Sequence, residues 1–296
     1  MTALFALSRS ANRSLSALSI CALLHLMPLS LAAAQSPAPL PAKPDSAEAG
    51  GRRVSARSGL FSFGALALGA IAVSQFDEPV ARWARSPSVH DNRSLRGASR
   101  GFRTIGDPGA LMLTAGLYGV GRLSRKPSLA DAGLHGTEAV IVSGAASGLI
   151  KLVAGRARPN LLTDGGPVEF PEGTDEFRPL RGIRQYTSFP SGHTTVAFAA
   201  ASSLASELHR ANPSAARVLG PLLYGSAAAV GFSRIRDNQH WASDVVAGAV
   251  IGTVVGRSMV AYGHRRSRPW MARWLLPASI TPTGRELTLR WSPWPR

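Results

Sequence analysis

A histidine and an aspartate four residues apart form the clearest chemistry-bearing pair in the sequence. They are His240 and Asp244, and they frame the segment His-Trp-Ala-Ser-Asp. Residues four apart share one face of a helix, so the carboxylate can accept the Nδ1 proton of the imidazole. That hydrogen bond fixes the tautomer whose Nε2 is free to attack phosphorus. Taken alone, the pair also fits a hydrogen bond on a helix surface or half of a metal site.

A second histidine and a set of cations supply the other groups that phosphoryl transfer needs. His193 follows Pro190-Ser191-Gly192 and can protonate a leaving oxygen, a contribution of about 10²–10⁴-fold. Phosphoryl transfer depends mainly on positioning and charge stabilisation, which guanidinium forks, an ammonium group and helix N-termini provide. The residues available to bind the phosphate oxygens are Lys151, Arg158, Ser191, Gly192 and Arg234.

These residues fall into three separated motifs. The first is Lys151, six residues, Arg158-Pro159; the second is Pro190-Ser191-Gly192-His193; the third is Ser233-Arg234, five residues, His240, three residues, Asp244. Their order and spacing resemble the three-part signature of the type 2 phosphatidic acid phosphatase and vanadium haloperoxidase superfamily, and every fixed position is filled. The resemblance covers roughly residues 111–262.

The resemblance implies a role for each motif residue. His240 would be the nucleophile, Asp244 its orienting partner and His193 the general acid. Lys151, Arg158, Ser191, Gly192 and Arg234 would form the phosphate cage. It also implies metal-independent hydrolysis without a cofactor.

Several chemically capable residues lie outside the motif positions. Arg156 and Arg236 flank motif residues, and we interpret them as surface charges or as charges behind the cage. Trp241 is expected to pack rather than bind substrate. The loop arginines Arg178, Arg181 and Arg184 fit either an anionic headgroup or plain solvation. We expect the remaining histidines to be structural or exposed, and we find no further cluster of metal ligands; these histidines are His90, His135, His209 and His264.

Apolar stretches rich in Ala and Gly predict the elements that must position the motifs. Their composition and length favour helix over strand, which predicts an all-α bundle of about six core helices with the active site at the helix ends. Asp107-Pro108 and Asn212-Pro213-Ser214 mark two helix starts. The stretches are residues 59–75, 110–121, 139–150, 194–206, 218–233 and 245–256.

The segments around this core have different compositions. Residues 1–34 carry Arg9 and Arg13, an apolar run and Ala32-Ala33-Ala34, which is typical of a secretory signal peptide. Residues 35–57 are a Pro/Ala-rich flexible linker, and residues 58–265 form the helical phosphatase domain. Residues 160–190 form one long irregular loop. The tail, 266–296, contains the alternating segment GRELTLRW, which predicts a short hairpin around Gly284.

Charge and hydropathy bear on location and partners. The uncharged runs are about 12–18 residues, or about 18–27 Å of helix against a hydrocarbon core of about 30 Å. Mean hydropathy is only +0.06. We therefore expect a periplasmic domain, soluble or held at the membrane surface, in preference to a multi-pass inner-membrane protein. The net charge of +16 predicts anionic partners, but no nucleic-acid-binding motif accompanies it.

The sequence therefore predicts an exported phosphatase that hydrolyses phosphate monoesters or pyrophosphates, lipid-linked ones above all, through a phosphohistidine. The alternatives are a broad-specificity periplasmic acid phosphatase, a vanadate-dependent haloperoxidase and a non-catalytic protein that binds anionic membranes. The expected partner is a phosphorylated lipid or a small phosphate ester. Oligomeric state has no readable signal.

Overall fold

The computed structural model describes residues 72–161, 177–178, 180, 186–265, 279–283 and 286–290. Every described residue belongs to the unit Gly64–Arg296. The predicted signal peptide and linker lie outside the described residues. So do most of the first apolar stretch and much of the 160–190 loop.

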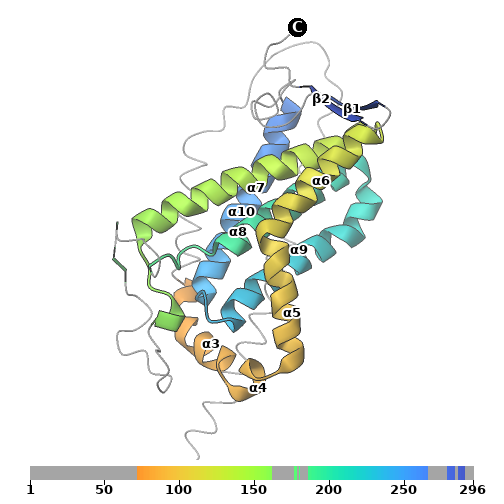
Figure 1. Cartoon of the computed structure of the whole chain (residues 1–296). Helices are drawn as coiled ribbons and strands as arrows, with labels where there is room; N and C mark the ends of the chain where they lie inside the picture. The colour runs from red at the N-terminus through yellow and green to blue at the C-terminus, as the bar shows by residue number, and fades with distance from the viewer. Residues whose placement is uncertain are drawn as a thin grey trace, which may run out of the picture. The chain divides into compact units, whose positions relative to one another are not determined.

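Helices dominate the described part of the chain (Figure 1). Three short helices come first: α3 (Asp77–Ala84), α4 (Pro87–His90) and α5 (Arg93–Thr104). A kinked π-helical turn, η1 (Ile105–Gly109), leads into the long helices, and a 3-10 turn, η2 (Pro159–Leu161), follows α7. The long helices are α6 (Ala110–Leu123), α7 (Pro127–Ala154), α8 (Gly192–Ala211), α9 (Pro213–Arg236) and α10 (Ala242–Arg265).

This architecture confirms the predicted all-α class. Five of the six predicted stretches lie within α6 to α10, and Asn212 caps α9 by accepting the amide hydrogen of Ala215 at 3.0 Å. The sequence analysis missed α3, α4 and α5. Helices α3 and α4 have only eight and four residues, and α5 is rich in Arg, so none of them has a long apolar run.

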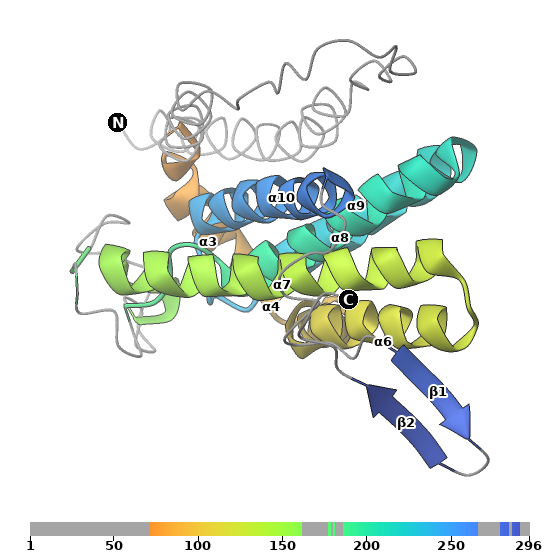
Figure 2. The ribbon, with the colours of Figure 1, turned by 90° about the horizontal axis from the view of Figure 1, so that it is seen from above.

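Glycines at every fourth position of α10 allow it to lie directly against α8. A Cβ atom at Gly252 would stand 2.2 Å from the carbonyl oxygen of Thr195, and one at Gly256 would stand 2.5 Å from that of Ala199. Small residues on one helix face permit such close backbone approach. The two helices run side by side in Figure 2. At one end, the Ser191 amide donates to the Asp244 carbonyl at 3.0 Å, which holds the second and third motifs together.

The first motif is placed by the way α7 ends. Gly155 is the C-cap of α7 with φ 59°, in the left-handed region that glycine adopts without steric cost. The chain therefore leaves the helix directly after Lys151 has been positioned on its last turn. Arg156 follows in an isolated β-bridge with Phe177, and its carbonyl accepts from the Ser188 amide at 3.0 Å.

The tail forms the predicted pair of strands. Strands β1 (Ser279–Thr283) and β2 (Glu286–Arg290) are antiparallel, with Thr281 paired to Thr288. The alternation of apolar and polar residues around Gly284 was therefore a correct strand signal.

Three helices are longer than the uncharged runs suggested. Helices α7, α9 and α10, of 28, 24 and 24 residues, are long and apolar enough to cross a membrane. At about 1.5 Å per residue they reach about 36–42 Å, so the length argument against spanning helices was wrong. Its error was to stop each helix at the nearest charge. Large apolar side chains are exposed on α6, α7 and α9, among them Met112, Leu149, Val153, Val218 and Leu222.

Candidate active site

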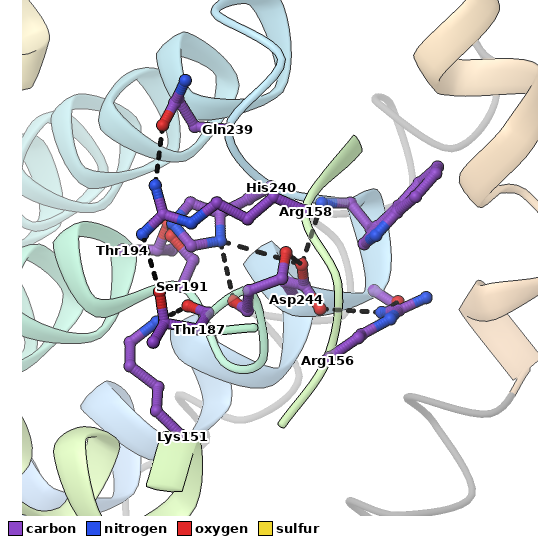
Figure 3. A network of polar contacts seen from close by, with 12 residues as sticks. Lys151, Arg156, Arg158, Thr187, Ser191, Thr194, Gln239, His240 and Asp244 are labelled. Carbon is purple, nitrogen blue, oxygen red and sulfur yellow. Dashed lines mark hydrogen bonds and ion pairs between the residues drawn. The ribbon is translucent and has the colours of Figure 1, made fainter. Parts of the chain in front are cut away.

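The predicted nucleophile, His240, is buried between the end of α9 and the start of α10 (Figure 3). Its Nδ1 lies 2.8 Å from the carbonyl oxygen of Ser188 and 3.7 Å from Oδ2 of Asp244. A carbonyl can only accept, so Nδ1 carries the proton and Nε2 keeps its lone pair. The tautomer is the predicted one, but its main acceptor is Ser188 and not Asp244.

Asp244 accepts hydrogen bonds from three residues. One of them is Ser188, whose carbonyl in turn accepts from His240. Oδ2 of Asp244 accepts from the Ser188 hydroxyl at 2.5 Å and from the Trp241 amide at 2.9 Å, and its Oδ1 accepts from Arg156 at 2.7 Å. The bond to Trp241 is that of an acidic N3 residue reaching back to the amide before the helix. The carboxylate therefore fixes both the start of α10 and the loop residue whose carbonyl holds the imidazole.

Arg156 joins this carboxylate to a second one. Its guanidinium donates to Asp244, to Oδ2 of Asp77 at 2.8 Å and to the Ser243 hydroxyl at 2.7 Å. Arg156 is 2% exposed and Asp77 is fully buried. Burial raises the pKa of Asp77, and the Arg156 charge opposes that rise. Arg156 is therefore not a surface charge; it lies behind the cage, where it neutralises two carboxylates.

The cage cations converge on the other side of His240. Lys151 donates from Nζ to the Thr187 carbonyl at 2.6 Å, and Arg158 donates to Gln239 at 2.7 Å and to the Thr187 hydroxyl at 3.1 Å. Lys151 lies close enough to Arg158 and Arg234 for their positive charges to repel its own. The charges of Lys151 and Arg158 also act on His240. Three motifs that are far apart in the sequence thus bring their charges together.

Two of these cations have a buried N–H donor without a hydrogen-bond acceptor among the described residues. Among the residues that the structure describes, Nε of Arg158 and Nε of Arg234 are buried without a hydrogen-bond partner. Arg234 is 6% exposed and reaches a carboxylate only at 4.0 Å, in Asp237. Buried polar groups are normally hydrogen-bonded, so orphaned guanidinium donors beside an imidazole are a prepared site for anionic oxygens.

The start of α8 contributes the second motif. Ser191 is the fully buried N-cap of α8, and its hydroxyl oxygen accepts from Thr194 at 2.8 Å, which leaves its own proton available for an anion. Gly192 lies beside Lys151: a Cβ atom at 192 would stand 3.6 Å from the Lys151 Cε. The free amides of this helix N-terminus therefore face the same region as the ammonium group.

His193 forms another wall of the site, next to the η1 turn. It is half-buried, and a Cβ atom at Gly106 would stand 3.3 Å from its side chain. Burial, followed by the charge of Arg234, lowers the pKa of His193 to about 4. Burial likewise lowers the pKa of His240 to about 4, so both imidazoles are neutral near pH 7 in the free protein.

Sequence reasoning missed the residues that support the cage. Thr187 and Ser188 stand just before Pro190-Ser191-Gly192-His193, and together they hold Lys151, Arg158, His240 and Asp244. Two hydroxyl residues beside a motif were a usable signal. Gln239 and Ser243 could have been predicted in the same way, because they are polar residues next to His240 and Asp244. Asp77 was not, since it lies about 80 residues before its partner Arg156 in a helix without a motif.

The other singled-out residues lie elsewhere. Trp241 is buried, as expected, and its indole nitrogen donates to Ala157 at 2.9 Å. Arg236 is buried and donates to the His90 carbonyl at 2.6 Å and to Asp237 at 3.1 Å, outside the cage. Arg178 lies over the Tyr186 ring at 5.0 Å. Arg181 and Arg184 are outside the described residues.

Comparison with known proteins agrees with this arrangement. Residues 133–268, which hold all three motifs, match the model of the PAP2 superfamily. Lipid phosphate phosphatase 1 of Arabidopsis thaliana is 35% identical over 152 residues, which cover 44% of this chain and 43% of that protein. A lipid A 1-phosphatase of Rhizobium etli is 33% identical over 115 residues, 38% of this chain and 42% of that protein.

One solved structure is also similar. It is a transmembrane PAP2 type phosphatidylglycerolphosphate phosphatase from Bacillus subtilis, with a TM-score of 0.48 and 18% identity, covering 71% of this chain and 97% of that one. Both curated relatives are matched over less than half of their own length.

Proposed function

We propose that this protein is a membrane-bound phosphatase that hydrolyses lipid-linked phosphate monoesters or pyrophosphates through a phosphohistidine, without a metal ion in the reaction. The observation that carries the proposal is the pairing of a buried His240, whose Nδ1 is engaged, with the unpartnered Nε donors of Arg158 and Arg234. A tetrahedral anion bound by those donors would lie beside the free Nε2.

The reaction follows from the two imidazoles. Nε2 of His240 attacks phosphorus, a P–N bond forms, and the P–O bond to the leaving group breaks as His193 gives that oxygen a proton. Water then attacks phosphorus, His193 takes a proton from it, and the P–N bond breaks to release phosphate. His193 must be protonated for the first step. The negative charge of the bound substrate favours that state by raising the pKa of His193 from its low value in the free site.

Two observations support a lipid-linked substrate. The relatives named above are lipid phosphate and lipid A phosphatases. In addition, α6, α7 and α9 expose large apolar side chains, and three helices are long enough to span a membrane. Exposed apolar surface of this kind indicates contact with lipid or with a partner protein. A phosphatase that lies in the bilayer meets lipid phosphates at the headgroup level.

A phosphate-release screen tests the activity. We expect the detergent-purified chain to release phosphate from lipid phosphates, isoprenyl pyrophosphates or soluble monoesters in the presence of EDTA, and vanadate to inhibit it. Preference for lipid substrates by at least about tenfold in kcat/KM supports the lipid proposal. Equal rates on soluble monoesters would favour a broad acid phosphatase, and loss of activity in EDTA with recovery in a divalent metal would overturn the metal-free reaction.

The intermediate has its own test. Rapid quenching with labelled substrate should trap an alkali-stable, acid-labile phosphoenzyme in the wild type. The His240→Ala variant should form none, whereas His209→Ala, which changes an exposed histidine on α8, should form it normally. An active wild type with no such adduct would mean that water attacks phosphorus directly.

Orientation can be tested with introduced cysteines, because the only native one is Cys21. In a Cys21→Ser background, Asp91→Cys marks the catalytic end and Arg210→Cys the opposite end, and both positions are exposed. An impermeant maleimide added from the periplasmic side should label only Asp91→Cys. We propose that the catalytic end faces the periplasm. Labelling of both positions would indicate a surface-bound domain, and labelling of Arg210→Cys alone would place the catalytic end on the cytoplasmic side.

A further inference from the structure

Two histidines and a glutamate meet far from the catalytic residues. His135 lies on the first half of α7, Glu207 near the end of α8 and His264 at the end of α10. Nδ1 of His135 is 2.5 Å from Oε1 of Glu207, and Nε2 of His264 is 2.9 and 3.0 Å from its two oxygens. We call these three residues the His-Glu-His cluster. This cluster could not be predicted from the sequence, because its members come from three helices and share no motif.

The cluster lies at the opposite end of the helices that form the catalytic site. On α7, His135 precedes Lys151 by about 16 residues, or roughly 24 Å of helix. On α8, Glu207 follows His193 by about 14 residues, or roughly 21 Å. Neither the proposed hydrolysis nor the family motifs use this end of the bundle.

We propose that the His-Glu-His cluster binds a divalent transition-metal ion, for which zinc has the best-matched chemistry. Its three donor atoms all lie within 4.8 Å of one another. Two imidazole nitrogens and one carboxylate oxygen are ligands that zinc takes at about 2.0–2.2 Å, with water as the fourth. Magnesium and calcium prefer oxygen ligands throughout, so two imidazoles select against them.

The two carboxylate–imidazole pairs need a small expansion to take an ion. Tetrahedral donors at zinc bond lengths stand roughly 3.3 Å apart, whereas the cluster's hydrogen-bonded pairs stand 2.5–3.0 Å apart. A shift of a few tenths of an ångström in each side chain would open that space. The ion would replace the hydrogen bonds from the two ring nitrogens to the carboxylate, and each imidazole would bind as the neutral tautomer that carries its proton on the other ring nitrogen.

Burial and charge favour a bound cation here. The side chains of His135 and Glu207 are 4% and 6% exposed, while that of His264 is 28% exposed and gives access for an ion and a water ligand. Oε1 of Glu207 lies within hydrogen-bond distance of both imidazoles, so the carboxylate stands where an ion ligated by those rings would need an anionic oxygen.

Gly263 fixes the direction of the buried imidazole. A Cβ atom at 263 would stand only 2.0 Å from Nε2 of His135, so the ring lies directly against the backbone of α10. Nε2 is enclosed there, and Nδ1 is the ring nitrogen turned toward Glu207 and His264. The close approach that only glycine allows thus points one ligand at the other two.

A metal ion at this place would tie α7, α8 and α10 together at the end away from the cage. Its role would be to stabilise the bundle, since it lies too far from His240 to touch a substrate there. The site does not depend on the proposed function: a protein without phosphatase activity could bind the ion equally well.

The experiment measures metal binding without any substrate. The full chain, with its purification tag removed, is stripped with EDTA in mild detergent and titrated with zinc against a chromophoric chelator. We expect about one zinc ion per chain and a rise of roughly 5 °C or more in the unfolding temperature at a hundredfold excess over Kd. Magnesium at the same concentration should produce neither change.

Two substitutions locate the ion. Glu207→Gln keeps the shape of a buried side chain, and His264→Ala changes a partly exposed one, so neither depends on rebuilding the core. Each should weaken zinc binding by at least about tenfold and abolish most of the thermal shift. His209→Ala, an exposed histidine two residues from Glu207, should bind zinc like the wild type. Failure of the wild type to bind zinc, or wild-type affinity in both cluster variants, would overturn the proposal.

Discussion

The two ends of the α7, α8 and α10 bundle use the same residue types for opposite purposes. At the catalytic end, His240 and His193 stand among arginines and a lysine, and two buried guanidinium donors lack partners. At the other end, His135 and His264 both contact the carboxylate of Glu207. Neighbouring charge decides the chemistry of an imidazole: the first end is prepared for an anion, the second for a cation.

The largest expected effect is that of removing the nucleophile at the first end alone. His240→Ala should lower kcat by at least about 10⁴-fold, because the proposed covalent intermediate forms on this residue. His264→Ala, at the second end, should keep kcat within about threefold at a temperature where the variant is folded. Both are measured as phosphate release, with circular dichroism as the check on folding. Comparable losses in the two variants would remove the distinction between the ends.

Asp244→Asn should have the next largest effect. The amide cannot accept from Arg156, Ser188 and Trp241 together, so the loop carbonyl that holds His240 loses its support. We expect kcat to fall by about 10²–10⁴-fold, with a measurable loss of stability.

The matched variant is Ser188→Ala, which removes the hydroxyl link and keeps the carbonyl. Its loss should be smaller, about tenfold, if Asp244 acts through Ser188. A Ser188→Ala enzyme as slow as Asp244→Asn would mean that the carboxylate acts through this hydroxyl alone, and that its bonds to Trp241 and Arg156 add nothing to the rate. An unchanged rate would favour direct orientation of His240 by the carboxylate at 3.7 Å.

Asp77→Ala tests the buried ion pair behind the cage by its stability. It leaves Arg156 buried with one carboxylate partner where it had two, and breaking a buried pair typically costs about 3–5 kcal/mol. We expect a loss of about 3 kcal/mol in the free energy of unfolding, measured in denaturant. Glu78→Ala, on the same helix, removes only an exposed pair with Arg82 and should cost less than about 1 kcal/mol. Similar losses in the two variants would contradict the buried network.

Helices with a long apolar run and residues within a motif could be predicted from the sequence. Residues that are brought together only by contacts between distant segments could not. The apolar stretches gave five of the long helices, and the motifs gave eight residues of one site. The wrong length argument came from treating charges such as Lys151 as helix boundaries, although a helix end can carry them. Asp77 and the His-Glu-His cluster could not be predicted, because no spacing rule links residues on three different helices.

The pH dependence of stability separates the two ends further. Because the pKa of His240 is about 4 when folded and about 6.5 when unfolded, the unfolded chain binds a proton that the folded chain does not. His240 therefore contributes a loss of about 3 kcal/mol as the pH falls from 6.5 toward 4, and His193, whose pKa is also lowered to about 4, adds a loss that the wild type and the variant share. The lowered pKa of Glu207 also stabilises the fold, but that stability is lost only as the pH falls below the unfolded value of 4.5. Unfolding temperatures of the wild type should fall from pH 6.5 to 4.5 more steeply than those of His240→Gln, and parallel curves would contradict the low pKa.

The smallest expected effect concerns the carboxylate nearest to the general acid. Asp107, on the η1 turn, raises the pKa of His193, which burial and Arg234 lower. Asp107 is exposed, so solvent screens its charge, and Asp107→Asn should lower the pKa of His193 only slightly. If His193 protonates the leaving group, the alkaline limb of the kcat profile should move to lower pH by less than about one unit, with at most a fewfold loss at pH 7. Asp131→Asn, on the first turns of α7, should leave the profile in place. A shift to higher pH would mean that the limb reports a group other than His193.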